Sequence, residues 1–147
     1  MGLPDGSVYG NNLNTENSQF VNLLPSTTIN CTATTMTDWI DLGNISVPSW
    51  ATKVRVKLEL CAIYQNSAAQ TSTARITING VTGNSRVLFN THINTNDRRD
   101  FSWTDEITPG ATGSVRLKVQ GMFSGSGLTL TADNNGSYVS AVCEFLP

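Results

Sequence analysis

The sequence predicts an all-β fold, an antiparallel β-sandwich with an extended arm at its N-terminus. Three observations lead to this prediction. From residue 27 onward, apolar and polar residues alternate, which is typical of strands that bury one face. Turn-forming residues interrupt these segments at regular intervals. No segment carries the apolar spacing of an amphipathic helix.

The clearest predicted strand spans residues 53–60. Val54, Val56, Leu58 and Leu60 point to one face, and the charged residues between them point to the other. A helix cannot keep those two faces apart. Similar patterns predict strands at residues 27–32, 38–42, 74–78, 86–91, 101–103, 115–119, 128–130 and 138–145.

Two Asn-Gly pairs separate predicted strands, at Asn79-Gly80 and Asn135-Gly136. Asn and Gly tolerate positive φ angles, so each pair predicts a tight turn. About eight or nine short strands with such turns between them favour a sandwich or a barrel.

Residues 1–26 differ from the rest of the chain. They are polar and rich in turn-forming residues, and their apolar residues are isolated. We expect this segment to be an extended N-terminal arm, followed by a single β-sandwich domain at residues 27–147.

Composition excludes several classes of function. A chain of 147 residues with 39% hydrophobic content builds one core and is too short for two. With a net charge of −2 and 14% charged residues, it lacks the cationic cluster that nucleic acid binding requires. We also expect no secretory signal and no membrane span, because no apolar run is long enough for either.

The three cysteines are Cys31, Cys61 and Cys143. Their number is odd and their spacing is wide, which argues against a disulfide framework and against a zinc site. We expect buried free thiols.

Few residues are candidates for chemistry, so we expect no enzyme, no cofactor and no metal. His92 is the only histidine, and no nucleophile signature accompanies it. Adjacent positions place Asp105 and Glu106 on opposite faces of a strand, which prevents a carboxylate pair. The charges of residues 96–100 are expected to pair with each other in a solvated loop.

Tryptophans either fill a core or stack on sugar rings when exposed. A core position is favoured for each of Trp39, Trp50 and Trp103. Trp103 alternates with Phe101 as a core pair would. Exposure of Trp39 and Trp50 together would instead indicate a carbohydrate site.

The order of strands and turns resembles a known family. Residues 47–56 (VPSWATKVRV) precede a hairpin at 73–80, the turn at 108–110 leads into 115–119, and NNGSYV closes the pattern at 134–139. Over roughly residues 27–147 the chain resembles the jelly-roll virion proteins of tailed bacteriophages. It is most similar to their head decoration, or cement, proteins, and also to β-sandwich domains of tail fibres.

This resemblance implies a jelly roll and a virion structural protein. Such a protein is made in the host cytoplasm and binds the capsid exterior, where it stabilises the lattice. The implied partners are the major capsid protein and copies of the chain itself in a homo-oligomer. The alternative is a receptor- or carbohydrate-binding domain of a tail fibre.

The arm is the part expected to hold the capsid. Its candidate contact residues are Tyr9, Phe20, Leu23 and Leu24, and packing of these residues on their own chain is the alternative. Removal of residues 1–25 is expected to weaken binding to capsids.

Overall fold

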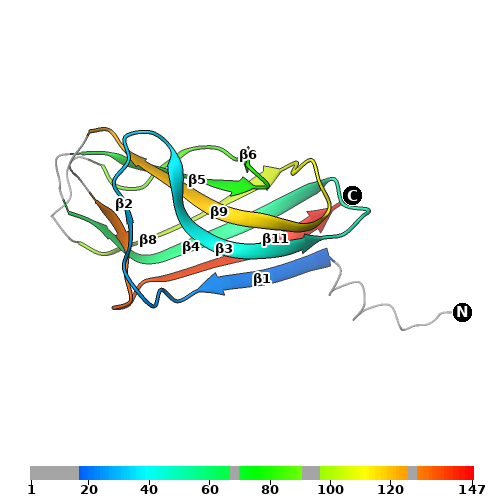
Figure 1. Cartoon of the computed structure of the whole chain (residues 1–147), viewed down its shortest axis with the longest axis horizontal. Coiled ribbons are helices and arrows are strands. Elements are labelled where there is room, and N and C mark those ends of the chain that lie inside the picture. Colours follow the sequence, from blue (N-terminus) through cyan, green and yellow to red (C-terminus); the bar gives the residue numbers. More distant parts are fainter. Residues whose placement is uncertain (1–16, 67–69, 91–96, 126–128) are drawn as a thin grey trace, which may run out of the picture.

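The computed structural model describes residues 17–66, 70–90, 97–125 and 129–147. These residues form eleven strands in two antiparallel sheets that lie face to face (Figure 1). The predicted all-β sandwich is confirmed. The strands are β1 (Ser18–Leu23), β2 (Ile29–Cys31), β3 (Thr37–Val47), β4 (Lys53–Gln65), β5 (Ser72–Ile78), β6 (Val81–Thr82), β7 (Arg86–Val87), β8 (Arg99–Ile107), β9 (Gly113–Phe123), β10 (Leu130–Ala132) and β11 (Tyr138–Leu146).

The long strands alternate between the two sheets. In the first sheet β11 lies between β1 and β4, β8 also pairs with β4, and β10 joins the end of β4 to β2. In the second sheet β9 lies between β3 and β5, and β6 and β7 pair with β5. The chain therefore crosses from one sheet to the other at each step from β1 through β3, β4, β5, β8 and β9 to β11. This winding is that of a jelly roll, as predicted.

Strand β4 shows how the sequence pattern produces the core. Val54, Val56, Leu58 and Leu60 are fully buried, and the charged residues between them lie on the outer face. The period-two alternation is thus the alternation between core and solvent. The pattern breaks at a β-bulge after Leu60, where Ala62 has a positive φ of 57°.

The Asn79-Gly80 pair is the tight turn that the sequence predicts. Both residues have positive φ angles, 52° and 77°, and they join β5 to β6 with Ile78 opposite Val81. The predicted strand at 86–91 is shorter than expected. Only Arg86 and Val87 form a strand with β5, Leu88 and Phe89 add backbone hydrogen bonds to Ser72, and residues 91–96 lie outside the described part.

The predicted arm is wrong for residues 18–23. They form β1, which pairs with β11 in an unbroken register from Ser18 opposite Glu144 to Leu23 opposite Val139. Val21 and Leu23 pack against the core. This segment also follows period two, but the exposed apolar residues Phe20 and Leu24 hide that period in the sequence. Residues 1–16, the remainder of the predicted arm, lie outside the described residues.

Candidate interaction surface

Exposed apolar side chains gather along β1. Phe20 and Val142 face each other across the pair of β1 and β11, and both point away from the core. Phe20 is 57% exposed and Val142 is 45% exposed, while Leu24, just after β1, is 68% exposed. We call Phe20, Leu24 and Val142 the β1 surface.

The orientation of these side chains follows from the alternation of inward and outward positions along each strand. In β1 the outward positions are Ser18, Phe20 and Asn22, and the inward ones alternate with them. In β11 the outward position of Val142 is matched by exposed Glu144, two residues further on. Phe20 and Leu24 are residues that the sequence predicts as contacts, but Val142 is not, although the charge of Glu144 two positions further on indicates that it points outward.

The four predicted contact residues separate into three groups. Phe20 and Leu24 are exposed, as a partner contact requires. Leu23 has the same inward orientation as Val21 and packs against the core of its own chain, which is the alternative that the sequence left open for it. Tyr9 lies outside the described residues.

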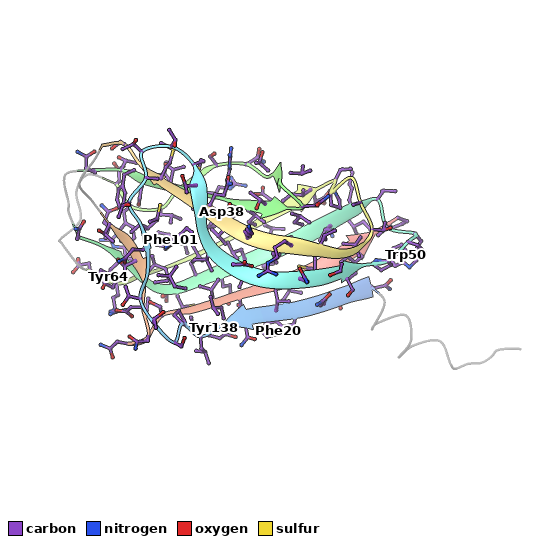
Figure 2. The ribbon with its side chains drawn as sticks, viewed as in Figure 1. Phe20, Asp38, Trp50, Tyr64, Phe101 and Tyr138 are labelled. Atoms are coloured by element: carbon purple, nitrogen blue, oxygen red, sulfur yellow. The ribbon has the colours of Figure 1, made fainter. Side chains whose placement is uncertain are left out.

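The tryptophans do not form an aromatic platform. Trp39 is buried, as predicted, and its indole N–H donates a hydrogen bond of 3.1 Å to the carbonyl oxygen of Ile29. Trp50 is 40% exposed, so the core prediction is wrong for it, and it lies at one end of the sandwich (Figure 2). Trp103 and Phe101 are half-buried against the core, and Phe101 contacts Phe89 edge to face.

Arg98 and Asp100 contact other segments of the chain instead of each other. The Arg98 guanidinium donates hydrogen bonds of 3.1 and 2.7 Å to the two carboxylate oxygens of Asp133, and it also lies over the ring of Tyr64. Asp100 accepts a hydrogen bond of 2.8 Å from the amide of Ala62 in the bulge. The predicted pairing within the loop is therefore wrong for Arg98 and Asp100, because both find their partners far away in the sequence.

The hydrogen bonds between Arg98 and Asp133 shift the pKa values of both groups. Hydrogen bonds from Arg98 hold the pKa of the Asp133 carboxyl below its usual value, and the same bonds raise the pKa of Arg98. The Asp133 side chain is 10% exposed, while Arg98 is 35% exposed. The pair ties β4, the segment before β8 and the turn before β11 to one another.

Other ion pairs lie on the solvated outer faces. Arg55 bridges Glu106 on β8 and Glu144 on β11, at 2.8 and 2.9 Å. Arg116 and Asp41 form a pair of 2.7 Å between β9 and β3. These exposed pairs link neighbouring strands, and such pairs contribute little to stability.

No convergent catalytic group appears among the described residues. Asp105 is buried and Glu106 is exposed, on the opposite faces that the sequence predicts. Within the described ranges no three His, Cys, Asp or Glu side chains gather as metal ligands, and His92 falls outside those ranges. No helix in the same ranges has the length and apolar character to cross a membrane.

The cysteines are free, as predicted, although only Cys31 and Cys143 are buried and Cys61 is half-buried. Burial raises the pKa of all three thiols, that of Cys143 to about 12. A thiolate nucleophile is therefore disfavoured at each position at neutral pH.

Known proteins give limited matches. No protein-family model matches the sequence, and no curated protein matches it. Among solved structures, T=1 particles derived from infectious bursal disease virus are similar over 88% of this chain, with 15% identity and a TM-score of 0.46. The VP2 subviral particle of the same virus is similar over 88%, with 12% identity and a TM-score of 0.44. This chain spans 36% and 37% of the length of those chains.

Proposed function

We propose that this chain is a structural protein of a virus particle, a decoration protein that binds the outside of the capsid lattice. The observation that carries this proposal is the β1 surface, where Phe20, Leu24 and Val142 are exposed and Phe20 and Val142 lie side by side on the outer face of the first sheet. Exposed apolar side chains that cluster mark sites of protein contact. The chain then works by contact, without catalysis and without a cofactor.

The surroundings of the β1 surface suit a protein partner. In the register of the sheet, Val142 lies between Phe20 on β1 and Lys57 on β4. Polar and charged side chains therefore border the apolar residues, as they do at the rim of many protein interfaces. Net charge is small, so affinity depends on apolar burial more than on electrostatic attraction.

A decoration protein is expected to bind a partner that belongs to the assembled capsid lattice. A protein that binds only the assembled shell stabilises it by mass action, because disassembly requires loss of every bound copy. Many weak contacts acting together are sufficient. The partner in this proposal is the major capsid protein, and the location is the capsid exterior.

The test compares two double variants of the chain. Both are measured for binding to expanded capsids of the virus that encodes the chain. Phe20→Ser with Leu24→Ser removes most of the β1 surface. The matched control is Val81→Ser with Val87→Ser, which removes apolar side chains of comparable exposure on β6 and β7. Co-sedimentation measures affinity and stoichiometry, and cryo-electron microscopy locates the bound chain.

We expect wild type and control to bind at a fixed number of copies per capsid. The β1-surface variant should bind at least about ten times more weakly, since burial of a large apolar side chain contributes roughly 1.5–3 kcal/mol and 1.4 kcal/mol is a factor of ten. Failure of the wild type to bind capsids, or an equal loss in the control, would overturn the proposal.

A further inference from the structure

We infer that Asn135 is a site of self-modification, where the side-chain amide converts into a carboxylate without an enzyme, while the fold protects Asn79 from the same reaction. The sequence contains two asparagines that are followed by glycine, at residues 79–80 and 135–136. The inference concerns the chemistry of the chain itself, and it holds whether or not the chain binds a capsid.

The reaction uses the backbone nitrogen of the glycine as the nucleophile. This nitrogen attacks the side-chain carbon Cγ of the preceding asparagine, so that a bond from nitrogen to Cγ forms and the bond from Cγ to Nδ2 breaks. The displaced Nδ2 takes up the proton that the backbone nitrogen gives up, and it leaves as ammonia. One water molecule then opens the cyclic imide at either carbonyl, which yields aspartate or isoaspartate. Glycine favours the attack because it has no Cβ to hinder the approach.

Asn135 is free to react in this way. Asn135 and Gly136 are both exposed in the turn between β10 and β11 (Figure 1). Gly136 has a φ of 114°, and beyond its chain neighbours no atom lies within 4 Å of the point where a Cβ would stand. In the part of the chain that the structure describes, no hydrogen bond holds the Asn135 side chain. Only its backbone amide is held, by donation to Asp133 Oδ1 at 3.1 Å.

Asn79 is also exposed, but hydrogen bonds hold it in place. Its side-chain Nδ2 donates to the carbonyl oxygen of Pro109 at 3.2 Å, and its backbone amide donates to the carbonyl oxygen of Arg116 at 3.0 Å. Pairing of Ile78 with Val81 closes the turn on both sides. Attack on Cγ of Asn79 requires the bond to Pro109 to break and the turn to distort, and both requirements slow the reaction.

Conversion of Asn135 changes the surroundings of the Arg98–Asp133 pair. It adds one negative charge to a chain of net charge −2, two residues from Asp133. Isoaspartate also carries the backbone through the former side chain, which lengthens the turn before β11 by one methylene. Asp133 accepts hydrogen bonds both from the Asn135 amide and from Arg98, so the modified turn acts directly on a group that binds Arg98.

The test incubates the folded full chain in mildly alkaline buffer and follows both asparagines over time. Peptide mapping by mass spectrometry distinguishes the acid from the amide at each site, and ion-exchange chromatography follows the more acidic chain. We expect Asn135 to convert at least about ten times faster than Asn79, because the hydrogen bond to Pro109 and the paired turn must open before Asn79 reacts. The rate at Asn135 should rise with pH, since the deprotonated nitrogen is the nucleophile.

Two variants and one change of conditions serve as controls. Asn135→Gln should abolish the acidic form at this site, because the longer side chain must close a less favourable six-membered ring. Asn79→Gly removes the other amide and accepts the positive φ of 52°, so the acidic form should accumulate as in the wild type. In urea, where the fold is lost, Asn79 and Asn135 of the wild type should convert at similar rates. Circular dichroism verifies that both variants fold.

Four results would each overturn the inference. The first is an unchanged Asn135 in the folded chain under conditions that convert it in urea, and the second is an equal rate at Asn79 and Asn135 in the folded chain. The third is a difference between the two sites that persists in urea. The fourth is an acidic form that accumulates undiminished in Asn135→Gln. None of these measurements involves capsids, so failure of this inference is distinguishable from failure of the proposed function.

Discussion

At the scale of single residues, the contribution of a charged side chain to stability depends on its partner and on its burial. Arg98 and Asp133 are 35 positions apart, and only the packing of the loops brings them together. Arg116 and Asp41 make a pair of the same chemical type with similar distances, but both side chains are substantially exposed. The two pairs differ in burial, and Asp133 also accepts hydrogen bonds from Asn135 and Ser137.

We predict that Asp133→Asn lowers the free energy of unfolding by about 1 to 3 kcal/mol, because a largely buried charge-assisted contact with Arg98 is lost. Asp41→Asn, the matched control on the exposed pair, should have a much smaller effect. Urea unfolding at neutral pH measures both. Equal effects of the two substitutions would contradict the role given to the Arg98–Asp133 pair.

The same pair predicts a dependence on pH. The pKa of Asp133 is lower in the folded chain than its usual value of 3.8, so the unfolded chain binds more protons between the two values. The stabilisation is complete above that usual value and is lost as the pH falls through the lower, folded value. The stability difference between wild type and Asp133→Asn should therefore shrink in acid, as urea unfolding at several pH values would show.

At the scale of elements, β1 is the strand for which the sequence prediction and the structure differ most. Polar, turn-rich neighbours and two outward apolar side chains make residues 18–23 resemble part of an arm. In the structure they complete the edge of the first sheet beside β11. The alternation of Val21 and Leu23 was the sequence feature that indicated a strand. Three inward positions are too few to establish a period of two.

Two truncations separate the arm from the strand. Removal of residues 1–16 leaves every strand of the described residues in place, so we predict little change in melting temperature. Removal of residues 1–25 also deletes β1 and uncovers β11, and we predict a loss of about 2 to 4 kcal/mol from lost burial of Val21 and Leu23 and lost strand pairing. Thermal unfolding measures both, and equal melting temperatures for the two truncated chains would contradict this assignment of β1.

At the scale of the whole molecule, the two sheets share one core. Successive long strands lie in opposite sheets, so neither sheet is made of a continuous piece of chain. Buried residues of both sheets form one cluster that includes Ile45 and Val119 from the second sheet and Leu58 and Val139 from the first. Neither sheet can keep its apolar face covered without the other.

We therefore predict that both sheets unfold in a single transition. In a Trp50→Phe background, Trp39→Phe leaves Trp103 on β8 as the fluorescent probe of the first sheet, and Trp103→Phe leaves Trp39 on β3 as the probe of the second. Urea midpoints from the two probes should coincide with each other and with that from circular dichroism. Separate midpoints would show that the sheets unfold independently.

The sequence by itself determined the fold class, most strands and the tight turn at Asn79-Gly80, because period two and turn chemistry are local properties. It also assigned the faces of β4 and the opposite faces of Asp105 and Glu106 correctly. Only the tertiary structure decided which strands pair, which apolar residues along β1 remain exposed, and that Asp133 is the partner of Arg98. Those features depend on contacts between distant segments, and the periodicity of a single segment carries no information about them.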